Sequence, residues 1–303
     1  MNSYEYNLLL RACHDRLGCM IDGKYRLEEL MGVGSAGAVY RATNTWVGRE
    51  YALKLFHPGP SQTDHALQRF IRESQVSNRI RKNGRPHPNV VDALDVGRDP
   101  NSGLFFSVQE FLVGETLERR MEKLPEHRLE VGEAVHLILP VVDALAAAHE
   151  VGVVHRDLKP DNIYLLHTEM GDVPKILDFG IAQLRDDRMT ASHELMGTPL
   201  YMAPEAFFGA SKVDARADVW AVGVILYQLI AGELPFPEAA NNVSLGALIA
   251  LVATAEIGSL ADRGLMSANA WRVLDRCLRR DPATRYAHAG ELRAGLHDVF
   301  EVV

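Results

Sequence analysis

The sequence is poor in cysteine and has no excess of basic charge, and each shortage argues against a class of protein. Its three cysteines, Cys13, Cys19 and Cys277, form no CxxC pair and cannot all pair with one another, which favours free thiols in a reducing cytosol. Lys and Arg number 32 against 40 Asp and Glu, for a formal net charge of −8. This balance leaves no basic footprint for nucleic acid, so no nucleic-acid partner is expected.

Long apolar runs are also missing. The best stretches, Val219–Ile230 and Leu245–Ala255, fall short of the roughly 18 residues that a membrane-spanning helix needs. The first ten residues contain Glu5 and lack the basic start and apolar run of a signal peptide. We therefore expect a cytoplasmic chain with no membrane span. No internal repeat or low-complexity tract is visible.

The first part of the chain carries patterns typical of strands. Trp46-Val47-Gly48 resembles a turn between two apolar segments, which predicts a hairpin. A charged helix is expected over residues 64–82, ending near the stop signal Asn83-Gly84. The strands expected on either side of this helix are 25–30, 38–43, 49–56 and 104–112.

The later part of the chain is mainly helical in pattern. Residues 133–150 place apolar side chains on one helical face, with Pro140 expected to kink the helix or mark an irregularity. Residues 215–231 are apolar nearly all round, which predicts a buried helix. Strands followed by helices predict the α+β class, with a small β-rich lobe and a larger helical lobe meeting near residue 112. Residues 1–17 form a short extension with helical character.

The first chemical motif is a glycine-rich segment containing Gly32, Gly34 and Gly37. Glycines let backbone N–H groups approach phosphate oxygens, although they also simply form turns. The residues that follow, Ala38 to Ala42, alternate like a strand rather than opening a helix, and no Lys-Ser/Thr follows the last glycine. A glycine-rich hairpin over a nucleotide is the phosphate-binding arrangement that remains.

Lys54 lies in an otherwise apolar strand. A buried ammonium group is unfavourable unless it is paired, so Lys54 either points to solvent from an edge strand or holds the α- and β-phosphates of a nucleotide. The second role requires a carboxylate, and Glu73 in the following helix is a candidate. Taken alone, Glu73 is better interpreted as a solvated helix residue.

The most informative segments are His155-Arg156-Asp157-Leu158-Lys159-Pro160-Asp161-Asn162 and Lys175-Ile176-Leu177-Asp178-Phe179-Gly180. Asp157, Asn162 and Asp178 supply hard oxygen ligands and a proton acceptor within a short span. Mg²⁺ prefers such oxygens and binds together with substrate phosphates.

With these motifs in place, the chain resembles the eukaryotic-like serine/threonine protein kinase family in its bacterial style, over roughly residues 20–300. The resemblance implies a bilobal kinase fold with a nucleotide cleft between the lobes. It places an N-terminal extension at 1–17, the N-lobe at 18–112 and the C-lobe at 113–303. It also implies ATP, Mg²⁺ or Mn²⁺ and protein substrates.

The resemblance assigns a role to each motif residue. Asp157 accepts the proton of the substrate hydroxyl, Lys159 contacts the transferred phosphate, and Asn162 and Asp178 hold the metal ion. Thr198, in Gly197-Thr198-Pro199, and Lys159 favour serine or threonine over tyrosine as acceptor. The nucleotide would be held by Gly32, Gly34, Gly37, Val39, Ala52, Lys54 (paired with Glu73), Glu110, Leu112 and Tyr164.

Further positions follow the same family pattern. Gln109 would guard the back of the nucleotide pocket, Glu205 would pair with Arg285, and Asp218 would brace the catalytic loop. Arg156 beside Asp157 implies that phosphorylation orders the activation segment. Thr190 and Ser192 are the candidate sites for autophosphorylation. A dimer is one arrangement in which autophosphorylation could occur.

Three positions depart from the family pattern without removing a catalytic group. Ala36 stands where an aromatic residue often tips the glycine hairpin, Ser77 where a larger apolar residue often packs, and Tyr164 where a smaller aliphatic residue usually lies beneath adenine. The alternatives to a protein kinase are a nucleotide-binding pseudokinase and a small-molecule phosphotransferase. An added interaction role through residues 1–17 or 238–264 also stays open.

Overall fold

The computed structural model describes residues 3–34, 37–56, 71, 76–179, 199–209, 213–240 and 243–300. The chain forms two compact units. Unit 1 consists of Met1–Asn78 and Val91–Val113, and unit 2 of Arg79–Val90 and Gly114–Val303.

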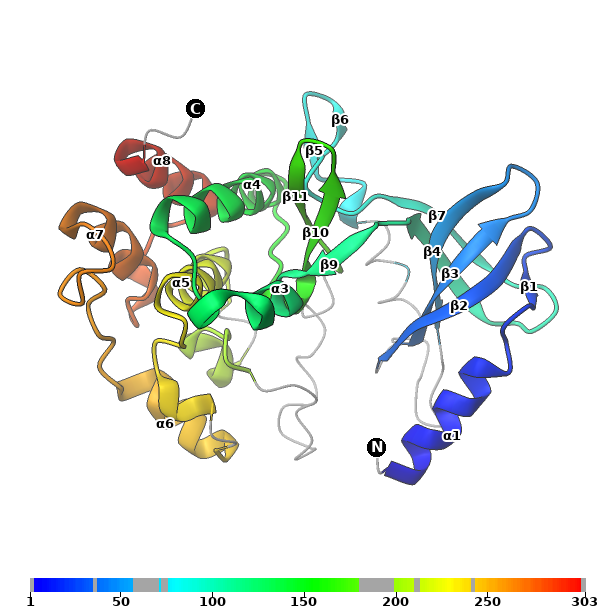
Figure 1. Cartoon of the computed structure of the whole chain (residues 1–303), viewed down its shortest axis with the longest axis horizontal. Coiled ribbons are helices and arrows are strands. Elements are labelled where there is room, and N and C mark those ends of the chain that lie inside the picture. Colours follow the sequence, from blue (N-terminus) through cyan, green and yellow to red (C-terminus); the bar gives the residue numbers. More distant parts are fainter. Residues whose placement is uncertain are drawn as a thin grey trace. The chain divides into compact units, whose positions relative to one another are not determined.

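Unit 1 is built on a six-stranded antiparallel sheet with the strand order β1-β2-β3-β4-β8-β7 (Figure 1). The β3–β4 hairpin turns at Gly48, whose φ of 69° suits a residue without a side chain, and this confirms the hairpin predicted there. The strands are β1 (Met20–Ile21), β2 (Tyr25–Gly34), β3 (Gly37–Asn44), β4 (Arg49–Phe56), β7 (Ala93–Arg98) and β8 (Phe105–Glu110).

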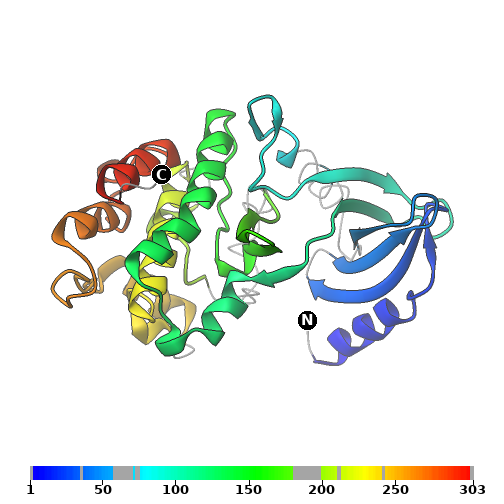
Figure 2. The same ribbon diagram turned by 45° about the horizontal axis from the view of Figure 1, so that its top comes forward.

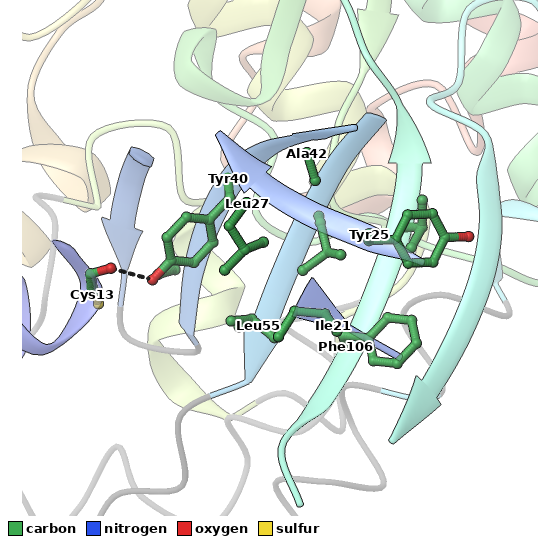
Figure 3. Close-up of a cluster of buried hydrophobic side chains, with 11 residues drawn as sticks. Cys13, Ile21, Tyr25, Leu27, Tyr40, Ala42, Leu55 and Phe106 are labelled. Atoms are coloured by element: carbon green, nitrogen blue, oxygen red, sulfur yellow. Dashed lines mark hydrogen bonds between the residues drawn. The ribbon is translucent and has the colours of Figure 1, made fainter. Parts of the chain in front are cut away.

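The core of unit 1 lies on one face of this sheet. Successive side chains of a strand point to opposite faces, so Tyr40 and Ala42 of β3 and Leu53 and Leu55 of β4 share the buried face. Figure 3 shows this cluster together with Phe106 of β8. The intervening residues of β3 and β4 therefore point to the other face of the sheet.

The N-terminal extension packs on the buried face. Helix α1 (Ser3–His14) lies beside β2 in Figures 1 and 2, and Leu9 and Cys13 join the core cluster. The Tyr40 hydroxyl donates a 3.0 Å hydrogen bond to the Cys13 carbonyl (Figure 3). The helical character expected for residues 1–17 is confirmed for Ser3–His14, and this helix belongs to the hydrophobic core of unit 1.

Unit 2 is mainly helical. α5 is buried along nearly its whole length, as its apolar sequence predicts, and α4 and α8 lie beside it (Figure 2). The α-helices are α3 (Leu117–Lys123), α4 (Val131–Glu150), α5 (Arg216–Ala231), α6 (Leu245–Thr254), α7 (Ala268–Cys277) and α8 (Ala289–Phe300). Short 3-10 turns are η1 (Pro125–His127), η2 (Pro160–Asn162), η4 (Pro204–Phe208), η6 (Pro237–Ala240) and η7 (Pro282–Thr284).

Helix α4 runs without interruption through Pro140. Among the residues described, α4 is also the one helix with the length and apolar composition of a membrane-crossing segment. Half of its apolar window is buried inside the protein, where α4 packs on α5 and α8. A helix in a protein core can have the same length and apolar composition as a membrane-crossing helix, so these two properties alone are weak evidence for a membrane span.

Two small sheets in unit 2 differ from the sequence prediction. β9 (Gly114–Thr116), β10 (Ile163–Thr168) and β11 (Gly171–Ile176) form a three-stranded antiparallel sheet where mainly helix was expected. β5 (Arg81–Lys82) and β6 (Arg85–Pro86) form a hairpin where the helix 64–82 was expected to end.

The hairpin has a clear physical cause. Asn83 and Gly84 both adopt positive φ, 53° and 75°, which is the conformation that an Asn-Gly pair favours in a two-residue hairpin turn. The prediction of helix at Arg81 and Lys82 was therefore wrong, because the stop signal acts as a strand turn.

The predicted fold class is confirmed. Unit 1 is β-rich, unit 2 is mainly helical, and strands precede helices along the chain, as expected for the α+β class.

Candidate active site

The segment with the strongest chemical signal forms a loop between α4 and η2. The chain leaves α4 through Gly152, whose φ is 73°, and backbone N–H groups of Val151, Gly152 and Val153 bond to the carbonyls of the last helical turn. This ending sends the chain back towards α5, where residues 155–162 follow.

Asn162 connects the two polar segments of this region. Its side-chain Nδ2 donates to the Asp157 carbonyl at 2.7 Å, and its own carbonyl accepts from the Leu177 backbone N–H at 2.9 Å. Asp178 directly follows Leu177. The structure therefore holds Asp157, Asn162 and Asp178 close together in one hydrogen-bonded pair of loops.

Lys159 lies in the same loop, immediately before η2, and its carbonyl accepts from the Asn162 backbone N–H at 2.9 Å. The side chains of Asp157, Lys159, Asn162 and Asp178 are all partly exposed. Polar groups of both signs can thus reach a ligand from one surface of unit 2.

Asp218 braces the loop from α5. Its carboxylate accepts 2.8 Å hydrogen bonds from the backbone N–H groups of His155 and Arg156, which is the bracing role that the family resemblance implies. Arg156 has a φ of 65°, a left-handed conformation that is unfavourable for a residue with a side chain. The two hydrogen bonds to one buried carboxylate hold the backbone in this conformation.

His155 joins the loop to the segment around Asp178. Its Nδ1 accepts from the Asp157 backbone N–H at 3.3 Å, and its Nε2 lies 3.2 Å from the Leu177 carbonyl. The ring also meets Phe179 edge-on at a centroid distance of 5.0 Å. Asp178 itself has a positive φ of 51°, so both carboxylate-bearing segments have a locally unusual backbone.

Several acidic side chains lie near Lys159, in helix α3 and in η2. Burial raises the pKa of Glu118 in α3, and the like charges of Asp161 and Glu122 raise it further, whereas Lys159 opposes the effect. Burial also raises the pKa of the Tyr201 phenol, and the charges of Glu118 and Asp161 add to this rise. The loop therefore presents its lysine in an acidic neighbourhood.

The oxygen donors suit a hard divalent cation. An amide oxygen from Asn162 and a carboxylate from Asp178, together with phosphate oxygens and water, match the ligand set of Mg²⁺. In the part of the chain that the structure describes, no group of three or more His, Cys, Asp or Glu side chains forms a metal site. Asn162 and Asp178 supply one amide oxygen and one carboxylate, which is only part of the six-oxygen shell that Mg²⁺ prefers.

Unit 1 carries the second set of predicted residues. Lys54 lies in β4, is buried, and stands opposite Val39 of β3 and Ser107 of β8 in the sheet register. Ala52 and Lys54 alternate with the core residues of β4, so they lie on the sheet face opposite the core cluster. The lysine and Ala52 therefore share one face of the strand.

The glycine segment forms the end of the β2–β3 hairpin. Gly34 stands opposite Gly37 in the register, while Gly32 pairs with Val39. A Cβ at Gly37 would lie 2.0 Å from the Leu55 carbonyl oxygen, so no other residue fits there without moving the backbone. Ser35 and Ala36 lie outside the described residues.

Glu110 ends β8, and Leu112 is buried just beyond it. The backbone N–H of Glu110 donates to the Asp92 carbonyl at 3.2 Å, and its carboxylate accepts from the Asp92 N–H at 3.0 Å. In unit 2, the Tyr164 hydroxyl donates to the Gly114 carbonyl at 2.8 Å. This bond holds the Tyr164 ring against β9.

Two predicted site residues, Glu73 and Thr198, lie outside the described residues, as do Thr190 and Ser192. The predicted partners Glu205 and Arg285 are both described, and they form a two-pronged ion pair, which confirms that prediction.

His149 is a residue of this region with a buried side chain that was not predicted from the sequence. It lies in the last turn of α4 with Nε2 2.9 Å from Asp218 Oδ2. The sequence offers one signal for this residue: His149 follows Leu145 by one helical turn, so a polar side chain lies on the apolar face of the helix.

Comparison with known proteins agrees with this architecture. A family model for the protein kinase domain matches residues 25–295. The chain belongs to the protein kinase family, in its bacterial serine/threonine branch. Protein kinases as a class use ATP and a divalent metal ion.

Particular relatives are bacterial. The chain is 38% identical over 279 residues to serine/threonine-protein kinase Pkn1 of Myxococcus xanthus, covering 90% of this chain and 38% of that protein. It is 34% identical over 289 residues to pkn3 of the same organism, covering 93% and 51%. The chain spans about a third to a half of the length of these curated relatives and of pkn2 from the same organism.

A solved structure with the same fold is the kinase domain of PknI from Mycobacterium tuberculosis. The match has a TM-score of 0.68 at 26% sequence identity and covers 94% of this chain and 99% of that one. The protein-kinase fold predicted from the sequence is therefore confirmed.

Proposed function

We propose that this chain transfers the γ-phosphate of ATP to serine or threonine hydroxyls of other proteins. The observation that carries the proposal is the linkage through Asn162, which holds Asp157 and the Leu177–Asp178 segment in one hydrogen-bonded array. Phosphoryl transfer depends mainly on positioning and on stabilising negative charge. This array would position the reacting groups, while Lys159 and a bound metal ion would stabilise the negative charge.

The residues of unit 2 supply the groups around the transferred phosphate. Asp157 orients the acceptor hydroxyl and takes its proton, and Lys159 neutralises charge on the transferred phosphate. Asn162 and Asp178 hold Mg²⁺ or Mn²⁺, which when bound neutralises charge on the phosphate oxygens. Tyr164 faces the adenine and offers it an aromatic ring, with its hydroxyl fixed by Gly114.

The residues of unit 1 hold the nucleotide. Lys54 binds the α- and β-phosphates with Glu73 as its partner, and backbone groups around Gly32, Gly34 and Gly37 contact the phosphates. Val39 and Ala52 pack on the adenine. Because the Glu110 N–H already bonds to Asp92, its adenine contact would use the carbonyl, with Leu112 supplying the neighbouring backbone group.

The domain assignment and the location belong to the same proposal. Residues 1–17 are an extension, 18–112 the N-lobe and 113–303 the C-lobe. The chain acts in the cytoplasm, which is consistent with its free thiols at Cys13, Cys19 and Cys277.

Lys159 and the family pattern around Thr198 support serine and threonine as the residues that receive the phosphate. Short hydroxyl side chains of proteins are the proposed acceptors.

Thr190 or Ser192 is the proposed autophosphorylation site, and a dimer would bring one activation segment to the active site of a second copy. Peptide mapping after incubation with ATP tests this, and unmodified segment peptides from an active sample would contradict it.

The main experiment measures transfer from γ-³²P-ATP to a mixture of protein substrates. Wild-type protein should label serine and threonine. Asp157→Asn should lose about 10²–10⁴-fold in rate, and Lys54→Met should lose most of the transfer, both with unchanged circular dichroism. ATP binding without transfer would instead support a pseudokinase. Labelling of small alcohols in place of protein would support a small-molecule phosphotransferase.

A further inference from the structure

The hairpin formed by β5 and β6 concentrates positive charge in one short segment of unit 2 (Figure 1). Its residues Arg79–Pro86 include four basic side chains and no acidic one, in a chain whose formal net charge is −8. All four, Arg79, Arg81, Lys82 and Arg85, are exposed. The rest of the chain is therefore more acidic than the whole, and this basic hairpin is a local exception to its charge.

The basic hairpin is held in place at its base and at its turn. Ile80 is fully buried, and its carbonyl accepts a 3.2 Å hydrogen bond from the His87 N–H. The Arg79 guanidinium donates to the Val151 carbonyl at 3.1 Å, just beyond α4. The turn at Asn83-Gly84 has the positive φ values of a two-residue hairpin turn. The basic side chains therefore start from a fixed backbone, so little backbone ordering is required when they bind a partner.

Two of the basic residues face each other across the hairpin. Lys82 stands directly opposite Arg85 in the strand register, and like charges in that position are destabilising. The Lys82 ammonium lies 2.6 Å from the Asp143 carboxylate, but the same carboxylate also binds Arg293. Two cations therefore share one anion, and a third cation lies across the hairpin from one of them.

The arginines of the hairpin have no acidic partner in the described part of the chain. There, Arg79 and Arg81 bond to backbone carbonyls, and neither they nor Arg85 form an ion pair. By contrast, the exposed Arg263 of the same unit pairs with Glu233. An arginine carries five N–H donors in a planar fork that matches a carboxylate. The hairpin thus presents donors that suit an anionic ligand.

We propose that the basic hairpin is a docking site for a short acidic peptide segment of a partner protein, whose carboxylates pair with Arg81 and Arg85. Such a segment would also relieve the repulsion between Lys82 and Arg85. A membrane surface or a nucleic acid would face parts of the chain outside the hairpin as well, and their net charge is negative. A short segment can contact the hairpin alone.

Fluorescence anisotropy measures the binding of the whole chain to two labelled peptides of equal length. One is rich in Asp and Glu, and the other has each acid replaced by its amide. The acidic peptide should bind and the amide peptide should not. Binding should weaken from about 50 to about 300 mM NaCl, because salt screens exposed charges. Docking needs no phosphoryl transfer, so these measurements are made without ATP.

A pair of double variants locates the site. Arg81→Gln with Arg85→Gln removes two charges from the hairpin and leaves its buried anchors unchanged. This variant should bind the acidic peptide about five- to tenfold more weakly, as expected for the loss of two exposed ion pairs. Arg272→Gln with Arg279→Gln removes the same charge from exposed positions in and just after α7, and this control should bind like the wild type.

Equal losses in the two double variants would overturn the proposal, because net charge alone would then attract the peptide. Unchanged affinity of the hairpin variant would overturn it too. Tighter hairpin-dependent binding to phosphatidylserine vesicles than to the acidic peptide would assign the hairpin to a membrane surface instead. If the variants do not fold, NMR of the wild-type chain decides: the Gly84 amide signal should shift when the acidic peptide is added, and an unmoved signal contradicts docking at the hairpin.

Discussion

The buried guanidinium group of Arg285 donates all five of its N–H hydrogens, two of them to the carboxylate of Glu205. Its two terminal nitrogens bond to the two carboxylate oxygens at 2.8 and 2.9 Å, and its remaining hydrogens go to the carbonyls of Arg216, Arg279 and Arg280. The side chain is 0% exposed, and its guanidinium lies 5.0 Å from the centroid of the Trp220 ring. A planar group with five donors fits this site, and a point charge does not.

Arg285→Lys should therefore destabilise unit 2. Lysine keeps the positive charge, but it cannot bond both carboxylate oxygens and three carbonyls. Breaking a buried pair of this kind typically lowers the free energy of unfolding by about 3–5 kcal/mol. Urea denaturation followed by tryptophan fluorescence measures the change.

Arg263→Lys is the control for this substitution. Arg263 pairs with Glu233 at 2.9 Å, but both side chains are well exposed, 39% and 47%. Such pairs contribute about 1 kcal/mol or less. A loss at Arg285 no larger than the loss at Arg263 would show that the buried network does not stabilise the fold.

The contact between α1 and the sheet gives a second prediction. Tyr40→Phe removes the hydroxyl that bonds to the Cys13 carbonyl and should lower the free energy of unfolding by about 1 kcal/mol. Removing residues 1–17 should lower it further, because Leu27, Tyr40 and their neighbours would lose apolar cover. Differential scanning fluorimetry compares the three proteins. A truncated protein that melts with the wild type would mean that the extension does not stabilise unit 1.

A third prediction concerns acid. His87 is buried, its Nδ1 accepts from the Asn89 N–H at 3.2 Å, and its Nε2 lies 3.3 Å from Asp143 without hydrogen-bond geometry. Burial lowers the pKa of His87 below its ordinary value of 6.5, and the charge of Asp143 only partly offsets this. The unfolded chain therefore binds a proton more readily than the folded protein as the pH falls through 6.5, so stability should decline below that pH.

His87→Asn tests the source of this decline. An asparagine oxygen can replace Nδ1 as the acceptor for Asn89 and does not titrate. The melting temperature of this variant should change less between pH 7.5 and 5.5 than that of the wild type. Identical pH profiles would exclude His87 as the group responsible.

The metal ion gives a fourth prediction. EDTA should abolish phosphate transfer, and Mg²⁺ or Mn²⁺ should restore it, because Asn162 and Asp178 supply only part of a coordination shell that phosphates complete. Asn162→Ala should raise the Mg²⁺ concentration needed for half-maximal rate by about tenfold or more. Full activity of Asn162→Ala at low Mg²⁺ would contradict the assignment of this residue.

The long periodic elements were predictable from the sequence because their patterns repeat over many residues. The strands expected at 25–30, 38–43 and 49–56 and the buried helix expected at 215–231 match Tyr25–Gly34, Gly37–Asn44, Arg49–Phe56 and Arg216–Ala231 in the structure. The same holds for Asp157, Asn162 and Asp178, whose spacing is local and whose residue types suit one chemistry. The structure brings these three together, while their roles remain proposals.

The short elements were not predictable, because their partners are distant in the sequence. β9 has three residues, and its pairing with β10 joins positions about fifty apart, as Thr116 and Tyr164 show. Asn83-Gly84 can end a helix or turn a hairpin, and only the pairing of Arg81 with Pro86 decides between them. The same distance concealed His149, whose partner Ala289 is 140 residues away.

The hairpin also determines where this chain can be divided. Arg79–Val90 belongs to unit 2, although the sequence on both sides of it belongs to unit 1. Lys82 binds Asp143, and Asn89 bonds to Pro174, both far downstream. A recombinant fragment that stops at Val113 would carry a segment without its partners, and a chimera with a relative would need to exchange the hairpin together with the helical portion.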